Sequence, residues 1–256
     1  MFNIEEFDIK CNTEFIGRNF IYLDEVESTN SFLLNSTEYN EHGTIVLAEY
    51  QSAGKGRLDR NWVSAKEDNL LFSILLNENI DAENINLLVL GSSLAVAQSV
   101  ENLFQLPVEI KWPNDILIDK KKAAGILLES SSKGNKIEKV VIGFGINVNQ
   151  TAFEGQYNIR PTSIRFETGH PVSRERVLSE ILNNFEEVII NIVNDPLKVL
   201  NDWKSKCKML GEKIAIVDGE NKKTGIFEDV DDKGFLLLRT PSGLEKILFG
   251  DVSLRA

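Results

Sequence analysis

Four apolar segments of strand length follow one another closely in the middle of the chain, at residues 108–112, 115–118, 124–129 and 139–148. The connections between them are mostly short and turn-like. Antiparallel strands can be joined by a turn of a few residues, whereas parallel strands need a crossover of about a dozen residues or more. We therefore predict that this part of the chain forms a largely antiparallel sheet.

Other segments extend this sheet and cover it with helices. Further strands are predicted at the apolar or β-branched runs 21–24, 44–50 and 70–76. Ser28 or Thr29 can cap a helix that begins at Asn30. Residues 85–104 are too many for one strand and predict a buried helix, and residues 173–192 predict an amphipathic helix. The fold class is α+β, with a mixed, largely antiparallel sheet and helices on one side.

The pattern changes after Trp203. From residue 211 onward the sequence holds only short alternating strands. Turn signals separate them at Asp218-Gly219, Lys233-Gly234 and Ser242-Gly243. Such a succession is typical of a small all-β barrel. We predict one larger domain at residues 1–208 and a small β-barrel at residues 209–256.

Charge and patterning argue against several classes of protein. The formal net charge of -11 and the pI near 4.8 disfavour broad nucleic-acid binding, which rests on many Lys and Arg contacts to phosphate. The acidic N-terminus lacks the features of a signal peptide, and no apolar run reaches the roughly 18 residues that span a bilayer. Cys11 and Cys207 are predicted to be free thiols in a reducing cytosol, with a single bridge between them as the alternative. We expect a cytoplasmic protein that binds neither DNA nor membranes.

The segment QSAGKGRLDRNW, residues 51–62, concentrates glycine and positive charge in this acidic chain. It is not a P-loop, because Gly56 follows Lys55 where that motif requires Ser or Thr. It is not a dinucleotide fingerprint either, because Asp59 stands where the third glycine belongs. Taken alone, the loop fits a phosphate cradle, a nucleic-acid contact and a plain solvated turn.

Three further motifs favour a functional interpretation. KWPND, residues 111–115, places a cation, an aromatic ring, a proline, an amide and a carboxylate where a strand ends. KKAAGILLE at 121–129 and GFGINVN at 143–149 carry small residues that let a ligand approach the backbone. In the structural alternative, Trp112 belongs to the core and residues 113–115 form an ordinary turn. That alternative is acceptable for any one residue but explains the combination less well.

Metal-dependent hydrolysis and serine acyl transfer have no support in the sequence. His42 and His170 stand in no recognisable arrangement, and there is no H-E-x-x-H motif, cysteine cluster or G-x-S-x-G elbow. No protein side chain is predicted as a metal ligand.

The motifs ESTN at 27–30, QSAGKGRLDRNW, KWPND, KKAAGILLE and GFGINVN resemble, in order and spacing, those of biotin protein ligases. The resemblance covers residues 22–149 and continues as a pattern through the C-terminal region. It implies a class II synthetase-like catalytic domain at 1–208 and an SH3-like barrel at 209–256. In the family's reaction, biotin and ATP form biotinyl-5′-AMP and pyrophosphate. A lysine of the biotin carboxyl carrier domain of acetyl-CoA carboxylase, or of another biotin-dependent carboxylase, then takes the biotinyl group.

The residues suit this chemistry. Because the substrate carboxylate is itself the nucleophile, a catalytic Ser, Cys or His is unnecessary. The site must hold two anions in line, neutralise their repulsion and exclude water from a labile acyl phosphate. A glycine loop with Lys and Arg supplies the neutralisation. Mg²⁺ is expected together with ATP, because it screens the phosphates.

The resemblance implies a role for each motif residue. The biotin contacts are Ser28, Thr29, Asn30, Gln51, Lys55, Gly56, Arg57, Lys122 and Gly125, with the ureido ring at Ser28 to Asn30 and Gln51. The contacts to ATP and the adenylate are Arg57, Arg60, Trp62, Asn114, Lys122 and Asn147. The catalytic candidates are Arg57, Lys111, Asp115 and Lys122.

Some of these roles have alternatives. Lys122 would hold the biotin carboxylate and later the phosphate. Asp115 would position or deprotonate the acceptor lysine, or it would only cap a turn. Lys111 would be a phosphate contact or the structural partner of a nearby carboxylate.

The chain departs from the usual family pattern in two places of the loop. Lys55 stands where an arginine is common, a change that is silent only if that position works through its backbone N–H. Leu58 stands where a further basic residue is often found. About twenty residues precede the first predicted strand, too few for a helix-turn-helix, so we expect a monofunctional ligase that is a monomer or a homodimer.

Two other functions are compatible with the same fold. Lipoate and octanoate ligases bind an apolar tail, which needs no row of hydrogen-bonding groups, so the row Ser28 to Asn30 with Gln51 favours biotin. A non-catalytic sensor of biotinyl-AMP is the second alternative. Retention of Arg57, Asp115 and Lys122 together argues against it.

Overall fold

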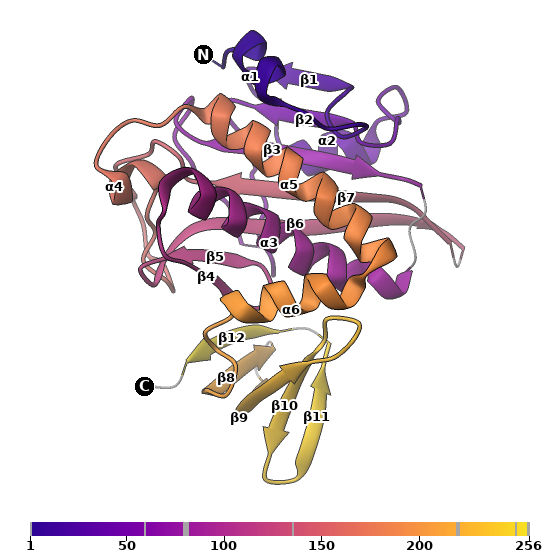
Figure 1. Cartoon of the computed structure of the whole chain (residues 1–256), viewed down its shortest axis with the longest axis vertical. Coiled ribbons are helices and arrows are strands. Elements are labelled where there is room, and N and C mark those ends of the chain that lie inside the picture. Colours follow the sequence, from indigo (N-terminus) through magenta and orange to yellow (C-terminus); the bar gives the residue numbers. More distant parts are fainter. Residues whose placement is uncertain are drawn as a thin grey trace.

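A seven-stranded sheet forms the centre of the larger part of the molecule, in the order β1-β2-β3-β7-β6-β5-β4 (Figure 1). The computed structural model describes residues 2–58, 60–78, 82–134, 136–218, 221–248 and 250–254. The strands are β1 (Phe20–Leu23), β2 (Ile45–Ala48), β3 (Leu70–Leu76), β4 (Val108–Lys111), β5 (Asp115–Ile118), β6 (Lys121–Lys133) and β7 (Lys136–Ile146). β1 pairs with β2 in parallel, and the other neighbours pair antiparallel, which confirms the predicted mixed sheet.

Helices lie on both faces of this sheet. They are α1 (Ile4–Lys10), α2 (Thr29–Asn35), the 3-10 helix η1 (Ala82–Asn84), α3 (Ile85–Phe104), α4 (Ile164–Thr168), α5 (Arg174–Asn194) and α6 (Pro196–Lys206). The long helices α3 and α5 cover one face, as predicted (Figure 1). The sequence predicts helices on one side only. The structure differs, because the short α2 packs on the opposite face over Val46, Leu75 and Val141. Because helices cover it on both faces, the middle of the sheet reads as continuous apolar runs rather than as alternating ones.

Helix α3 matches the predicted buried helix residue for residue. Its length and composition would allow it to cross a membrane, with a mean hydropathy of 1.4 over an 18-residue window. However, 67% of that window is buried inside the molecule, between the sheet and the helices α5 and α6. We interpret α3 as the core helix of the larger domain.

Local hydrogen bonds fix both ends of α2, which carries the predicted ESTN motif. Ser28 is the N-cap, and its side chain accepts a hydrogen bond from the backbone N–H of Ser31. At the other end, Lys139 Nζ of β7 donates to the carbonyl of Ser36 at 2.6 Å. Thr29 and Asn30 in the first turn are therefore held firmly against the sheet, where both are 3% exposed.

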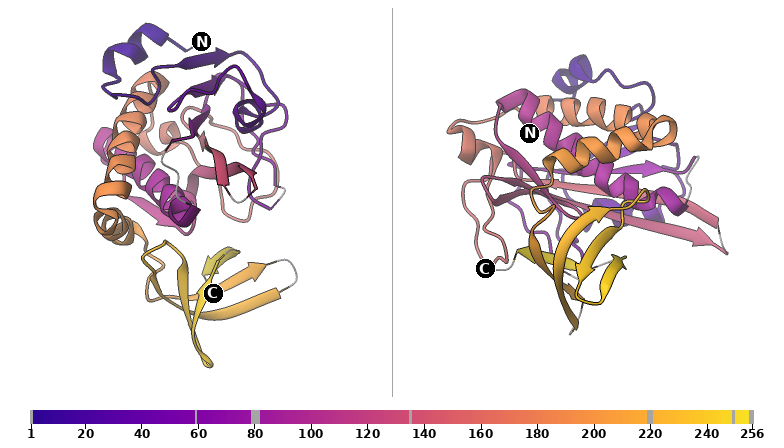
Figure 2. Two further views of the ribbon diagram at one scale, coloured as in Figure 1. Left: turned by 90° about the vertical axis from the view of Figure 1, so that its right-hand side faces the viewer. Right: turned by 60° about the horizontal axis from the view of Figure 1, so that its bottom comes forward.

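A five-stranded antiparallel sheet forms the C-terminal part, coloured orange to yellow in Figure 2. Its strand order is β11-β10-β9-β8-β12. Its strands are β8 (Lys213–Asp218), β9 (Asn221–Val230), β10 (Leu236–Thr240), β11 (Gly243–Ile247) and β12 (Asp251–Leu254). The small β fold and its turns at Lys233-Gly234 and Ser242-Gly243 are as predicted, whereas Gly219 of the third predicted turn lies outside the described residues. We propose the domain boundary between residues 208 and 209, since α6 ends shortly before it and β8 begins shortly after it.

The two parts are joined by specific contacts. The indole N–H of Trp112, in the KWPND motif, donates to the carbonyl of Gly234 at 3.4 Å. Lys233 of the same turn pairs with Glu83 at 2.8 Å. The small domain therefore supports the turn that carries the KWPND motif.

Both cysteines are free thiols, as predicted. Cys207 is buried, and this burial raises the pKa of its thiol to about 11. The thiol is therefore protonated and unreactive at neutral pH.

A buried ion pair fixes the end of β2, just before the glycine loop. Arg174 donates hydrogen bonds from both of its terminal nitrogens to the carboxylate of Glu49, and it also donates to the carbonyl of Asn69 at 3.2 Å. The same carboxylate accepts hydrogen bonds from the Tyr22 hydroxyl at 2.5 Å and from the Phe2 backbone N–H at 3.0 Å. The side chains of Arg174 and Glu49 are only 6% and 1% exposed.

The pKa values of this cluster reflect its burial and its hydrogen bonds. Burial alone would raise the pKa of the Glu49 carboxyl, but the hydrogen bonds from Arg174 and Tyr22 outweigh it and lower the pKa below its ordinary value of 4.5. Burial and the hydrogen bond to Glu49 raise the pKa of Tyr22 to about 12. Stability from Glu49 is therefore fully present above pH 4.5 and is lost as the pH falls through the lower folded pKa.

We expect Arg174→Met to lower the free energy of unfolding by about 3–5 kcal/mol at neutral pH, because it leaves a buried carboxylate without its partner. Urea denaturation measures this loss. The loss should shrink at acid pH, where Glu49 is protonated. The matched control is Arg239→Met, which removes an exposed pair with Glu228 and should change the midpoint little. Equal losses in the two variants would contradict this account.

Candidate active site

A cleft of about 1580 Å³ opens between the sheet, the glycine loop and the C-terminal domain. Strands β4 to β7 supply its floor, and residues 153–161 form part of its wall. The predicted site residues line it without exception: Ser28, Thr29, Asn30, Gln51, Lys55, Gly56, Arg57, Arg60, Trp62, Lys111, Asn114, Asp115, Lys122, Gly125 and Asn147. Motifs spread over more than a hundred residues of sequence therefore meet in one cavity.

One end of the cleft is lined by neutral hydrogen-bonding groups. The Gln51 side-chain oxygen accepts from the Thr29 backbone N–H at 2.8 Å and lies 3.1 Å from the Thr29 hydroxyl. The buried Ser73 hydroxyl lies 2.7 Å from the Thr29 hydroxyl and 2.6 Å from Asn30 Oδ1. These contacts fix the orientation of each side chain, so this end presents a preorganised polar row.

Glycines on β6 and β7 leave the floor of the cleft bare. Gly125 and Gly145 are direct cross-strand neighbours, and the Trp62 indole lies over both. A Cβ atom at Gly145 would lie 2.5 Å from Cε2 of Trp62, and one at Gly143 would lie 2.2 Å from Oδ1 of Asn30. Any larger residue at these two positions would displace the side chains that line the cleft.

The glycine loop is a small hairpin rather than an open coil. Lys55 and Asn61 form a β-bridge, and the Gly56 N–H donates to the Arg60 carbonyl at 2.7 Å. The Trp62 N–H donates to the Gly54 carbonyl at 2.9 Å, which sets the position of the indole. The loop therefore aims its cationic side chains and its indole at the cleft.

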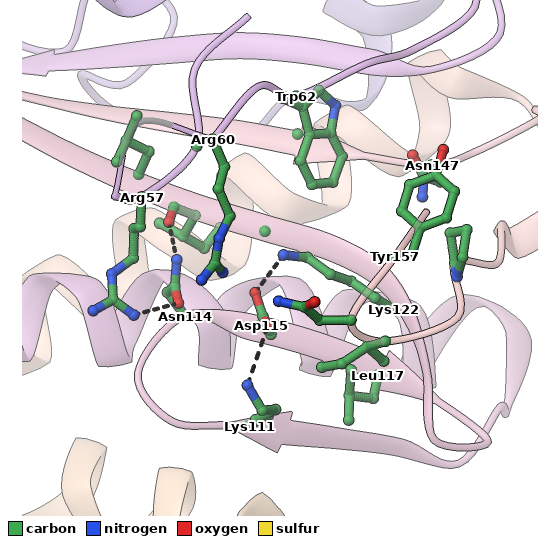
Figure 3. Close-up of a pocket in the computed structure, with 18 of the residues that line it drawn as sticks. Arg57, Arg60, Trp62, Lys111, Asn114, Asp115, Leu117, Lys122, Asn147 and Tyr157 are labelled. Atoms are coloured by element: carbon green, nitrogen blue, oxygen red, sulfur yellow. Dashed lines mark hydrogen bonds and ion pairs between the residues drawn. The ribbon is translucent and has the colours of Figure 1, made fainter. Parts of the chain in front are cut away.

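Arg57 links the loop to two other segments. Its guanidinium donates to Asn114 Oδ1 at 3.2 Å (Figure 3). It also donates to the carbonyl of Gly250, in the C-terminal domain, at 3.1 Å. Asn114 is itself held by a hydrogen bond from Nδ2 to the Ile126 carbonyl at 2.6 Å. The predicted phosphate ligand Arg57 thus also connects the loop to the KWPND turn and to the small domain.

The other end of the cleft is cationic. Asp115 lies between two lysines, with Oδ1 at 2.6 Å from Lys122 Nζ and Oδ2 at 3.6 Å from Lys111 Nζ (Figure 3). Lys122 also lies above the Trp62 ring, with Nζ 5.5 Å from the ring centroid. Two ammonium groups against one carboxylate leave a net positive charge, which favours an anion in this part of the cleft.

The pairing of β4, β5 and β6 creates this arrangement. Lys111 faces Asp115 across the β4–β5 turn, and Asp115 faces Gly125 on β6. The register of β5 against β6 shifts next to Lys122, as in a β-bulge. Such bulges re-aim side chains beside binding sites.

Comparison with known proteins agrees with this geometry. Residues 22–147 match the model of the biotin/lipoate A/B protein ligase family, and residues 209–255 match that of the biotin protein ligase C-terminal domain. The bifunctional ligase/repressor BirA of Bacillus spizizenii is 34% identical over 248 residues, which are 94% of this chain and 76% of that protein. This chain belongs to the biotin protein ligase family.

Two further relatives extend the comparison. The biotin–[acetyl-CoA-carboxylase] ligase of Paracoccus denitrificans is 32% identical over 237 residues, which are 90% of this chain and 98% of that protein. The biotin protein ligase of Aquifex aeolicus, solved in complex with biotin and ATP, superposes with a TM-score of 0.82 at 34% identity. That match covers 93% of this chain and 99% of the Aquifex ligase.

Sequence reasoning missed some residues that line or support the site of this biotin ligase. Ser73 is a polar residue within an apolar strand, and Glu129 is the last residue of the KKAAGILLE motif. Each position therefore weakly indicated a role in the site. Tyr157 lines the cleft but gave no such indication, because it lies in an irregular loop. The backbone of Lys122 pairs with Arg160 and Thr162, and this pairing holds the loop against the cleft.

The Trp62 indole N–H is buried and has no hydrogen-bond partner among the described residues. A buried donor without an acceptor is costly, and a bound ligand can remove that cost. This property marks Trp62 as a candidate ligand contact of the biotin ligase, in addition to its position over the glycine floor.

We expect Gly145→Ala to displace the Trp62 indole from the floor of the cleft. Acrylamide quenching of tryptophan fluorescence measures this, because Trp112 and Trp203 are only 3% and 0% exposed and contribute little. Quenching should increase strongly in Gly145→Ala. It should increase less in Gly125→Ala, whose Cβ would lie 3.1 Å from the indole and needs only a small shift. Unchanged quenching in Gly145→Ala would contradict the placement of the indole.

Proposed function

We propose that this protein is an ATP-dependent ligase that activates biotin to biotinyl-5′-AMP and transfers the biotinyl group to a lysine of a biotin carboxyl carrier protein. The proposal rests on one observation, namely that the two ends of the cleft differ in polarity. Its neutral row of hydrogen-bonding groups suits the ureido ring of biotin, and its cationic end suits a carboxylate and a phosphate. Biotin carries the ureido ring at one end and the carboxylate at the other, and ATP supplies the phosphate.

In the first step, a biotin carboxylate oxygen attacks the α-phosphorus of ATP, and pyrophosphate leaves. Lys122 binds the carboxylate and then the phosphate of the adenylate, while Arg57 closes the loop over it. Both cations offset the repulsion between the two anions that must meet. Trp62 packs against the nucleotide side, and Asn114 and Asn147 line it.

In the second step, the acceptor lysine amine attacks the acyl carbon of biotinyl-AMP. The carbon–oxygen bond to phosphate breaks, AMP leaves and the nitrogen loses a proton. We place Asp115 at this step, because its carboxylate already holds one ammonium group at 2.6 Å and can bind or deprotonate another. Lys111 acts as the structural partner of Asp115, an assignment that the 3.6 Å separation supports.

Mg²⁺ is proposed to arrive with ATP. Among the described residues, no group of three or more His, Cys, Asp or Glu side chains is arranged to hold a metal ion. The ion would therefore bind mainly through the phosphates, whose charge it screens.

The carrier is proposed to be the biotin carboxyl carrier domain of acetyl-CoA carboxylase or of another biotin-dependent carboxylase. The name of the Paracoccus relative supports this class of partner. The carrier must present its lysine at the Asp115 end of the cleft.

The function is tested by mixing the purified protein with ATP, Mg²⁺ and either biotin or lipoate. Mass spectrometry detects the acyl-adenylate and the mass gain of an added carrier domain. We expect biotinyl-AMP and a biotinylated carrier. Adenylate from lipoate only would contradict the proposal, and adenylate without transfer would favour the sensor alternative.

Lys122→Met should abolish most adenylate formation, because the lysine neutralises both reacting anions. Loss of one such preorganised group costs about 10²–10³-fold in rate. The comparison variant is Lys111→Met, which also removes a cation beside Asp115 but should slow pyrophosphate release less than tenfold. Equal losses would contradict the separate roles of the two lysines.

Arg57→Gly should release biotinyl-AMP into solution, because the loop loses its hydrogen bonds to Asn114 and Gly250. Filtration followed by mass spectrometry separates free adenylate from bound adenylate. Free adenylate biotinylates exposed lysines of bystander proteins. If Arg57→Gly labels only the carrier lysine, the retention role of Arg57 is wrong.

A further inference from the structure

Glu129 on β6 bridges two parts of the cleft that are distant in sequence. Its Oε2 accepts a hydrogen bond from Asn30 Nδ2 at 2.8 Å, and its Oε1 pairs with Lys55 Nζ at 3.2 Å. Asn30 belongs to the neutral end and Lys55 to the glycine loop. One carboxylate therefore contacts both the ring-binding row and the loop.

The contacts of Asn30 determine which way its amide points. Nδ2 faces the Glu129 carboxylate and, at 3.1 Å, the carbonyl of Leu127. Both of these groups can only accept, so the nitrogen must face them and Oδ1 must face Ser73. Asn30 is 3% exposed and has no room to turn without losing these bonds.

This orientation gives the neutral end a defined polarity. Both amide hydrogens of Asn30 are engaged, so it offers a ligand only an acceptor, Oδ1. Gln51 has the opposite arrangement, because its oxygen accepts from Thr29 and its amide nitrogen is its donor. An acceptor and a donor in the same row match a cyclic urea, which carries N–H groups and a carbonyl.

The Glu129 carboxylate also links the glycine loop to β6, through its contact with Lys55. Lys55 lies in the hairpin of the glycine loop, and its side chain is 45% exposed, whereas that of Glu129 is 27% exposed. The pair ties the loop to β6, beside the end of the cleft that holds Asn30. The side chain of Lys55 thus supplies a contact between the glycine loop and β6.

We propose that Glu129 is a positioning residue of this site, which orients the Asn30 amide toward the biotin ring and holds the glycine loop closed through Lys55. The proposal rests on the proposed function. Glu129 acts through its two neighbours and does not touch the reacting atoms.

Two substitutions separate the contact of Glu129 with Asn30 from its contact with Lys55. Glu129→Ala removes both contacts and should weaken biotin binding, measured by calorimetry, about tenfold. This is the effect of one hydrogen bond to a charged group. Glu129→Gln keeps an acceptor for Asn30 and should restore most of that affinity. Because it loses the charge that faces Lys55, it should release biotinyl-AMP about two- to fivefold faster. If Glu129 only stabilised the fold, Glu129→Gln would not restore the biotin affinity while still releasing biotinyl-AMP faster.

A double-mutant cycle tests the contact with Lys55. Lys55→Met should speed release of biotinyl-AMP by the same factor as Glu129→Gln, and the double variant should be no faster than either single one. The matched control is Glu245→Gln on β11, which also loses a lysine partner, Lys223, but lies in the small domain. It should leave biotin affinity and release unchanged.

The outcomes distinguish this proposal from the proposed function. Wild-type protein that forms no biotinyl-AMP would contradict the function itself. If wild-type protein does form biotinyl-AMP, two results would overturn only the role of Glu129. One is an unchanged biotin affinity in Glu129→Ala. The other is a double variant whose release rate rises by the product of the two single effects. Thermal unfolding midpoints close to wild type show that each variant is folded.

Discussion

The bare backbone of β6 and β7 is the constraint on which the rest of the site depends. Gly125, Gly143 and Gly145 place no side chain on this part of the sheet, and Gly125 and Gly145 face each other across the two strands. The Trp62 indole and the Asn30 amide therefore lie directly on the sheet. A ligand above them contacts groups that are already held in place, so little ordering remains to be done on binding.

The cleft works by a difference in polarity between its two ends. One end holds neutral donors and acceptors whose orientations are fixed by each other, and the other end holds Lys111, Lys122 and Asp115 (Figure 3). The acidic net charge of the protein makes such a local concentration of cations necessary, since the surface as a whole repels anions. Arg57 joins this end to the small domain through Gly250, so the β-barrel takes part in forming the site.

Much of this could be predicted from the sequence because the signals are local. Residues 70–76 and 85–104 coincide with β3 and α3, and Ser28 caps α2 as its side chain allows. The hairpin of β6 and β7 is longer than predicted, because its outer half is polar and is held by pairing rather than by burial. Helix α6 was missed although Asp195 and Pro196 are a usual helix start. Ser73 and Glu129 could not be assigned, since their roles depend on register across strands. The role of the Lys55 side chain could not be assigned either, because it depends on the ion pair with Glu129, which is distant in sequence.

A crystal structure with a non-hydrolysable biotinyl-adenylate analogue tests the central claim most directly, because the claim concerns which end of the cleft holds which end of the ligand. We expect the ureido ring at Asn30 and Gln51, the acyl phosphate beside Lys122, and the Trp62 indole against the ligand. A ligand bound in the reverse direction, or an acyl phosphate out of reach of Lys122, would contradict this claim.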